Sequence, residues 1–417
     1  MNSAPAPAMG RGTPVEPPPS QSLRELAPCF LYLLVEVGRP ADWVPAIGIV
    51  RPGLIAAIWG AASLLRSERR PIPRPAWYMI ALILLMAINV PLARNNYLAF
   101  WGFVNFTVLV VGYVIPLATL PRTQRAARVL VTAYVLLHIP TALHSIVFSG
   151  TGSGGWMGDE NDVALALNVA LGMGYYVLPI QRSVWMRLLV LLAMGLDVAG
   201  VVTSNSRGGF VGLAALGSYL ILAGPRRGRI ISAILASAAL MAVLAPPEYW
   251  REIKSIQTAN EVGDTGEKRI YFWGMAWRMF LDHPITGVGT GNFGIRAADY
   301  EDKWRAETTG HHVWGRAAHS LYYTLLAEQG IVGVALFGAM LVWAGRAFWR
   351  LRGAAVRSRR KRALETYAMA ASIMAGIVAL LATGAFLSVI YYPVIWILVG
   401  LLAAVTSTAE DTGACSD

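Results

Sequence analysis

Long uninterrupted runs of apolar residues divide this sequence, and they constrain its fold more than any other feature. The hydrocarbon core of a bilayer is about 30 Å thick, so a helix that crosses it needs about 20 apolar residues. A scan with that length predicts about twelve transmembrane helices. They lie near residues 24–38, 45–65, 76–93, 97–120, 127–148, 161–180, 185–203, 208–223, 229–245, 320–345, 364–386 and 389–407. We therefore predict an all-α polytopic membrane protein with one large polar loop that contains short helices.

The composition agrees with a membrane environment. Hydrophobic residues make up 56% of the 417 residues and charged residues only 14%, whereas about a quarter of the residues in a soluble domain are charged. The formal net charge of +11 would suggest a nucleic-acid partner for a soluble protein. Here the basic residues lie in short clusters between apolar runs, so we interpret them as topology signals and expect no nucleic-acid partner.

The basic clusters predict the orientation of the helices, because loops rich in Arg and Lys stay in the cytoplasm. These clusters occupy alternate loops, at residues 66–74, 122–128, 182–187, 226–229 and 346–362. The intervening short loops carry few basic residues. Both termini are therefore expected in the cytoplasm, with the long polar loop and Arg207 on the opposite face.

The chain divides into five predicted segments. These are a disordered cytoplasmic tail at 1–22, transmembrane helices one to nine within 23–245, an outward loop at 246–319, helices ten to twelve within 320–408 and a cytoplasmic tail at 409–417. The first segment lacks the basic and apolar regions of a signal peptide. Cys29 lies in an apolar run and Cys415 in a polar tail, so we expect neither a disulfide framework nor a cysteine metal site.

A short polar turn between the seventh and eighth helices, both expected to be short, contains the first candidate site residue. Arg207 lies in Thr203-Ser204-Asn205-Ser206-Arg207-Gly208-Gly209, where the glycines allow a tight turn and the close approach of a ligand. Backbone amides at the start of a helix, beside a guanidinium, suit an anion. The structural alternative is an arginine that reaches toward lipid headgroups.

The outward loop contains a second candidate, Arg269. Apolar residues recur at helical spacing after it, which predicts an amphipathic helix at the membrane interface: Ile270, Trp273, Trp277 and Phe280. A glycine-rich segment follows at 283–293. No predicted strand precedes this segment and no Lys-Ser or Lys-Thr closes it, so we exclude a nucleotide site.

The loop ends in a histidine-rich stretch that contains His311, His312 and His319. Their spacing matches no common zinc pattern, and we expect no metal site. Histidine titrates near neutrality, which suits a general base. We prefer His319 as the base because it is expected to begin the tenth helix, and we consider Arg316 and His312 accessory candidates.

Taken in order, these motifs resemble the O-antigen ligase and polymerase superfamily. The resemblance rests on Ser206-Arg207-Gly208-Gly209, on Arg269…Trp273 followed by His283-Pro284…Gly287-Val288-Gly289…Phe293, and on His319-Ser320…Leu325…Glu328-Gln329-Gly330…Gly333. Its motifs cover residues 200–335. Ser320 departs from the family pattern, since many relatives have Asn after the histidine. The resemblance implies a bacterial inner-membrane glycosyltransferase whose large loop and active site are periplasmic.

The resemblance also implies a reaction. An O-antigen ligase transfers a glycan from undecaprenyl diphosphate to a sugar hydroxyl of lipid A-core, and membrane lipids are the other expected partners. Arg207 would stabilise the departing diphosphate, with Arg269 as a second binding residue, and His319 would take the proton of the attacking hydroxyl. A single displacement would invert the anomeric centre. This scheme requires no metal and no cofactor.

Three alternatives remain open. A polymerase of the same superfamily would join lipid-linked repeat units and would differ from the favoured ligase in its acceptor. A transporter would carry ionisable residues at mid-membrane depth or an inverted repeat. Glu36, Asp197 and Glu328 do interrupt apolar runs, although Glu328 fits a bracing role better than proton relay. A scaffold without activity would leave the Arg, His and aromatic residues of the loop unexplained.

Overall fold

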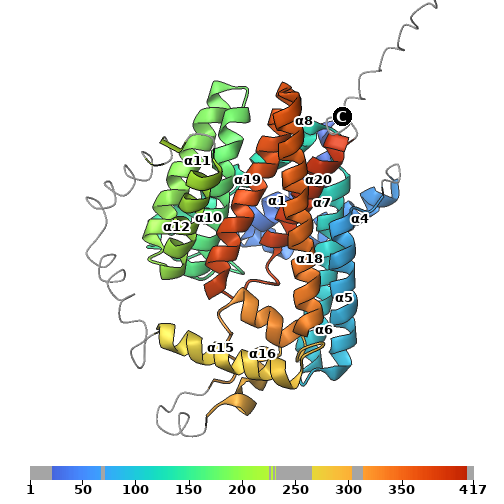
Figure 1. Ribbon diagram of the computed structural model, residues 1–417, viewed down its shortest axis with the longest axis vertical. Helices are drawn as coiled ribbons and strands as arrows, with labels where there is room; N and C mark the ends of the chain where they lie inside the picture. The colour runs from blue at the N-terminus through green and yellow to red at the C-terminus, as the bar shows by residue number, and fades with distance from the viewer. Residues whose placement is uncertain are drawn as a thin grey trace, which may run out of the picture.

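The structure is a computed structural model that describes residues 21–66, 71–224, 227–228, 231, 265–302 and 313–410. Most of these residues lie in helices, and within them the structure contains no β-strand, only an isolated bridge between Gly154 and Met157. Helices satisfy their own backbone hydrogen bonds, as the bilayer interior requires. Figure 1 shows the long helices packed side by side. The prediction of an all-α polytopic membrane protein is confirmed.

Eight helical segments in the described ranges are long and apolar enough to cross a membrane. They are α5 (Arg74–Leu92), α6 with η3 and α7 (Asn96–Thr107, Val108–Val114, Ile115–Thr119), α8 with α9 (Gln124–Leu136, Ile139–Val147), α10 with η4 (Glu160–Val177, Leu178–Ile180), α11 (Val184–Thr203), α18 (Leu321–Ser358), α19 with η7 (Lys361–Thr383, Gly384–Phe386) and α20 (Pro393–Glu410). Two shorter apolar helices accompany them, α4 (Pro52–Arg66) and α12 (Arg207–Ala223).

The predicted number of twelve spans is not confirmed. The ninth predicted span, near 229–245, falls almost entirely outside the described residues. The first is a series of short helices: η1 (Leu23–Leu26), α1 (Ala27–Leu33) and η2 (Leu34–Gly38), followed by α2 (Pro40–Trp43) and α3 (Ala46–Ile49). Glu36 lies in η2, a π-helical segment, where its carboxylate accepts a hydrogen bond from the Trp156 indole at 2.7 Å. The seventh helix was expected to be short, but α11 has 20 residues.

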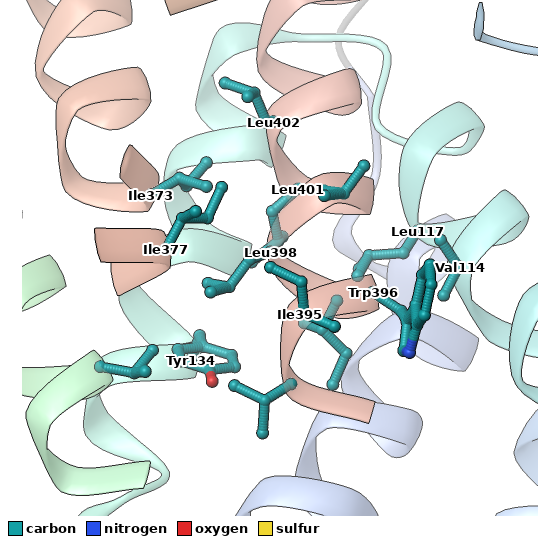
Figure 2. Packing of buried hydrophobic residues seen from close by; sticks show 14 of the residues in the cluster. Val114, Leu117, Tyr134, Ile373, Ile377, Ile395, Trp396, Leu398, Leu401 and Leu402 are labelled. Atoms are coloured by element: carbon teal, nitrogen blue, oxygen red, sulfur yellow. The ribbon is translucent and has the colours of Figure 1, made fainter. Parts of the chain in front are cut away.

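The core of the bundle surrounds α20, the most buried of the candidate spans, whereas α11 is the least buried. Figure 2 shows Ile395 and Leu398 of α20 facing Ile373 and Ile377 of α19. On another side of α20, Trp396 is 1% exposed and packs edge-on against Phe106. Lipid tails are as apolar as these side chains, so close packing rather than exclusion of water holds such helices together.

Small residues allow the helices to approach one another closely, as this kind of packing requires. Gly60 of α4 lies directly against Gly112 of η3, where a side chain at Gly60 would place its Cβ 2.4 Å from the Gly112 carbonyl oxygen. Gly212 of α12 has the same role, because a Cβ there would overlap Thr383 of α19 and Asn168 of α10. These contacts assemble α10, α12 and α19 into one unit.

The predicted outward loop contains α15 (Thr265–Asp282), α16 (Phe293–Arg296) and η6 (Ala297–Tyr300), and Figure 1 shows α15 and α16 together at the lower end of the bundle. The helix expected after Arg269 is therefore present, and its place at the membrane interface stays a prediction. Phe272, Met275, Ala276 and Met279 are buried, whereas Ile270 and Trp277 are exposed. The segment boundaries and the periplasmic side of this loop stay predictions.

Candidate functional site

The turn that carries Arg207 connects the end of α11 to the start of α12 and contacts the start of α10. Ser206 caps α12: its hydroxyl accepts a hydrogen bond from the Gly209 amide at 2.9 Å and donates one to the Asn161 side chain at 2.7 Å. Asn161 lies in the first turn of α10, whose N-cap is Asp159. Arg207 is thereby held, half-buried, at the first position of α12.

The two glycines after Arg207 serve helix packing. Both lie inside α12 with ordinary helical backbone geometry. A side chain at Gly209 would place its Cβ 2.5 Å from the Ala164 Cβ, and one at Gly208 would place its Cβ 3.4 Å from the Phe386 Cβ. The tight turn expected at these glycines occurs instead at Asn205, which has a positive φ of 51°.

Phe386 connects the Arg207 turn to the second candidate arginine. This residue ends η7, after α19, and contacts the Arg207 turn at Gly208. The Arg269 guanidinium lies 6.0 Å from the centre of the Phe386 ring, the separation at which a cation is attracted to an aromatic face. The Arg207 turn and Arg269, which are far apart in the sequence, therefore both approach one phenylalanine.

His319 lies immediately before α18 rather than within it. Ser320 is the N-cap of α18, and His319 has a positive φ of 49°. The preceding carbonyl of Ala318 accepts a hydrogen bond from the Trp273 indole at 3.1 Å, and Trp273 stacks on Tyr323 at 5.2 Å. Contacts with α15 and α18 therefore position His319, although α18 does not include it.

The surroundings of His319 favour its neutral form. Burial lowers the pKa of His319 from its usual value, and the positive charges of Arg269 and Arg316 lower it further, while Asp159 opposes them. Three charged residues from separate elements therefore lie within electrostatic range of the His319 imidazole: Arg269 of α15, Arg316 of the loop and Asp159 at the start of α10. A neutral imidazole can accept a proton at neutral pH, as a general base must.

The glycine-rich segment 283–293 packs against a break in α18. Gly330 interrupts that helix with φ 59° and ψ −162°, and the freed backbone groups pair with the segment. The amide of Ile331 donates to the Pro284 carbonyl at 2.8 Å, and the amide of Val288 donates to the Ala327 carbonyl at 2.9 Å. The loop is therefore fixed to a transmembrane helix along its length.

Glu328 occupies the position that an anionic ligand would take in a phosphate loop. Its carboxylate accepts hydrogen bonds from the amides of Gly291 at 2.9 Å and Phe293 at 3.1 Å. Next to it, the Gln329 amide donates to the Thr290 hydroxyl and the Tyr391 hydroxyl, both at 2.8 Å. These contacts support the exclusion of a nucleotide site and the bracing role expected for Glu328.

Arg316 and His312 are the two accessory candidates predicted from the sequence. Arg316 is exposed, and its charge acts on His319. His312, with His311, lies outside the described residues. Within the residues that the structure describes, no group of three or more His, Cys, Asp or Glu side chains could hold a metal ion.

Sequence reasoning missed the residues that connect these motifs. Phe386 carries no motif, and only its place after a predicted span could have drawn attention to it. The stretch that begins at Asp159 makes a hydrogen bond to the Arg207 turn through Asn161, and this contact depends on the packing of α10 against α12. Neither contact has a local sequence signal.

Comparison with known proteins gives one family match, in the region that carries the candidate residues. Residues 188–338 match the model of a family described as O-antigen ligase. The match runs from α11 into α18 and includes all five candidate residues. A comparison with curated proteins gave no match. Together with the membrane helices, the family match supports a multi-pass inner membrane protein with O-antigen ligase or polymerase-type activity. This match, with the motifs in the same region, supports the resemblance of residues 188–338 to the O-antigen ligase and polymerase superfamily.

Proposed function

We propose that the protein is an O-antigen ligase that transfers a glycan from undecaprenyl diphosphate to a sugar hydroxyl of lipid A-core at the periplasmic face. The observation that carries this proposal is the grouping of Arg269 and the Arg207 turn around Phe386, with His319 within electrostatic reach of Arg269. A cation beside a neutral base, with the Arg207 turn at the same phenylalanine, matches a reaction in which an anionic group leaves while a hydroxyl loses its proton.

The reaction would proceed by one displacement. The acceptor oxygen attacks the anomeric carbon, the bond from that carbon to the diphosphate breaks, and the diphosphate leaves with the bonding electrons. Arg207 and Arg269 stabilise the charge that develops on the leaving group, and one such interaction contributes about 3 kcal/mol. The proton of the hydroxyl passes to the His319 imidazole. The anomeric configuration is inverted, because attack and departure occur on opposite faces.

The burial of the site supports these roles. Arg207, Arg269 and His319 are all partly buried, and charges interact more strongly where protein and membrane exclude water. A lipid diphosphate is already an activated leaving group. The chain therefore needs no soluble nucleotide-sugar domain, and its glycine-rich loop is occupied by Glu328.

Purified protein, undecaprenyl-diphosphate glycan and lipid A-core provide the test, with glycan transfer followed on a gel with and without a chelator. We expect His319→Ala to lower the rate by about a hundredfold or more, and Arg207→Ala or Arg269→Ala by a similar factor. Arg278→Ala is the matched control. It removes a cation from the same helix, but one that pairs with Asp302 and the Tyr300 carbonyl, and it should keep the wild-type rate.

The possible outcomes distinguish the ligase from the polymerase and test the proposed mechanism. Glycan on lipid A-core with wild type and the control, and little with the three site variants, supports the ligase and its residue roles. A ladder of lengthened donor with unmodified lipid A-core means a polymerase that uses the same site. Wild-type rates for correctly inserted His319→Ala and Arg207→Ala proteins would contradict the mechanism.

A further inference from the structure

A second charged site lies at the other end of the bundle from the candidate active site. A cavity of about 470 Å³ opens where the starts of α8 and α19 meet the turn between α10 and α11. Six basic side chains line it: Arg122, Arg125, Arg128, Arg182, Lys361 and Arg362. We call this cavity the basic pocket. Since α19 has 23 residues, the pocket lies roughly 34 Å along that helix from its end beside Phe386.

The negative charge within the basic pocket is far too small to balance it. Glu365 is the one acidic residue among those that line the cavity in the described part of the chain. Its carboxylate is already shared, with Arg128 at 3.2 Å and Arg182 at 3.8 Å. Like charges gathered in a concave surface raise the local electrostatic potential and attract counter-ions. The pocket therefore favours an anion.

The placement of the basic residues on their helices adds to this argument. The N-terminus of a helix carries a partial positive charge, so basic side chains in its first turn are unfavourable. Both α8, with Arg125, and α19, with Lys361 and Arg362, begin in this way at the pocket. The Gln124 amide ties the two starts together by donating to the Arg362 carbonyl at 2.7 Å. The positive-inside rule explains why basic residues lie in these loops, but it does not require them to converge on one cavity. A bound anion would stabilise this convergence.

The surface beside the pocket identifies the source of the anion. Arg182 immediately precedes α11, the least buried span. The first residues of that helix are apolar and exposed, including Val184, Trp185 and Leu188. A tryptophan at the start of an exposed transmembrane helix is typical of the headgroup level. Acyl chains could therefore lie along α11 while their headgroup occupies the pocket.

We propose that the basic pocket binds the phosphate headgroup of an anionic phospholipid from the leaflet that it faces. The arginine distribution places that leaflet on the cytoplasmic side. Basic pockets between transmembrane helices on this side bind such headgroups in other membrane proteins. The volume allows a phosphoglycerol group with some of its water, since one water takes about 30 Å³. This site is separate from the one proposed for glycan transfer.

The test uses the purified full-length protein in detergent and soluble short-chain lipids. Binding of dioctanoyl phosphatidylglycerol is measured by thermophoresis, with dioctanoyl phosphatidylcholine and inorganic phosphate as competitors. The pocket variant carries Arg125→Gln, Lys361→Gln and Arg362→Gln, three exposed residues outside the Glu365 ion pairs. The control variant carries Arg346→Gln, Arg357→Gln and Arg359→Gln, which remove the same charge near the predicted cytoplasmic end of α18, outside the pocket lining. Melting temperatures show whether each variant is folded.

We expect saturable binding of the phosphatidylglycerol that weakens at least tenfold in the pocket variant and less than twofold in the control. Phosphatidylcholine should not compete, and inorganic phosphate should compete only at much higher concentration. Equal affinity for inorganic phosphate would overturn the lipid assignment in favour of a soluble phosphate compound. Equal weakening in both folded variants would mean that the whole basic face attracts the lipid, and the pocket assignment would be wrong. Absence of saturable binding to the wild type would also overturn it.

Discussion

At the scale of single residues, the electrostatics of His319 decide whether it can act as a base. Burial and the charges of Arg269 and Arg316 keep its pKa low, so the imidazole is neutral at the pH where the enzyme would work. A group that must be neutral gives activity that falls as the pH drops through its pKa. The acid limb of the pH–rate profile should therefore lie below the ordinary histidine range.

Arg316→Gln tests this relation without removing a proposed catalytic residue. Loss of its positive charge raises the pKa of His319, so the acid limb of kcat/KM should move to higher pH while the rate at alkaline pH stays unchanged. Arg278→Gln removes a charge from α15 that does not act on His319 and should leave the profile in place. An acid limb that stays fixed in the first variant would show that another group controls it.

The sequence was informative at this scale where chemistry follows from residue type. Arg207, Arg269 and His319 could be selected because cations and a histidine in an outward loop are uncommon in a chain so apolar. Phe386 could not be selected, because a phenylalanine after a hydrophobic run has no distinguishing chemistry. Its importance comes from the packing of η7 between α12 and α15.

At the scale of elements, the break in α18 fixes how the glycine-rich segment meets the membrane helices. The backbone conformation at Gly330 is one that residues other than glycine hardly ever adopt. A Cβ there would also approach the Ile285 carbonyl oxygen to 2.5 Å. The glycine thus serves two purposes, the helix break and the close approach of the loop.

Gly330→Ala should destabilise the protein by about 1 to 3 kcal/mol from backbone strain, with a further loss from the contact with Ile285. We expect a lower apparent melting temperature in detergent and lower transferase activity. Gly338→Ala and Gly345→Ala are matched controls in the same helix, since a Cβ at either position has no neighbour within 4 Å. Either control should be neutral or slightly stabilising. A melting temperature for Gly330→Ala as high as theirs would contradict this account.

Glu328 gives a second prediction for the same element. Glu328→Gln replaces the carboxylate that holds the amides of Gly291 and Phe293, and a weakened buried hydrogen bond costs about 1 to 3 kcal/mol. Hydrogen exchange in segment 284–293 should therefore accelerate by about tenfold. Glu410→Gln is the control, because Glu410 pairs with Arg350 at the far end of the chain. Unchanged exchange in Glu328→Gln would mean that the remaining backbone hydrogen bonds suffice to hold the loop.

The elements differ in how well the sequence predicted them. Long apolar runs predicted the eight segments that are long and apolar enough to cross a membrane in the described residues, because length and hydropathy decide whether a helix crosses a membrane. Periodicity predicted the α15 helix, in which Ile270 and Trp277 are exposed and Phe272 and Met275 are buried. Both faces of this helix carry apolar residues, so periodicity alone could not choose between them. The break in α18 was also missed, because a single glycine after Glu328 and Gln329 inside a predicted span does not by itself indicate a helix break.

At the scale of the whole molecule, both proposed sites depend on one orientation. The basic pocket and the starts of α8 and α19 lie at one end of the bundle, and α15 with the Arg207 turn lies at the other. The distribution of arginine predicts that the first of these ends faces the cytoplasm and the second the periplasm. The positive-inside rule gave this assignment from the sequence, whereas the gathering of six basic residues into one cavity required the fold.

The native cysteines allow this orientation to be measured. Cys29 is buried and should not react with a membrane-impermeant maleimide, so Cys415 in the predicted cytoplasmic tail is the reporter. We expect Cys415 to be labelled in inside-out membrane vesicles and protected in right-side-out vesicles. In a Cys415→Ser background, Trp314→Cys introduces a thiol at a residue that is 64% exposed beside His319, and it should show the opposite pattern. Labelling of Cys415 in right-side-out vesicles would reverse the orientation. The candidate active site would then face the cytoplasm, and neither the periplasmic transfer nor the cytoplasmic lipid site could hold.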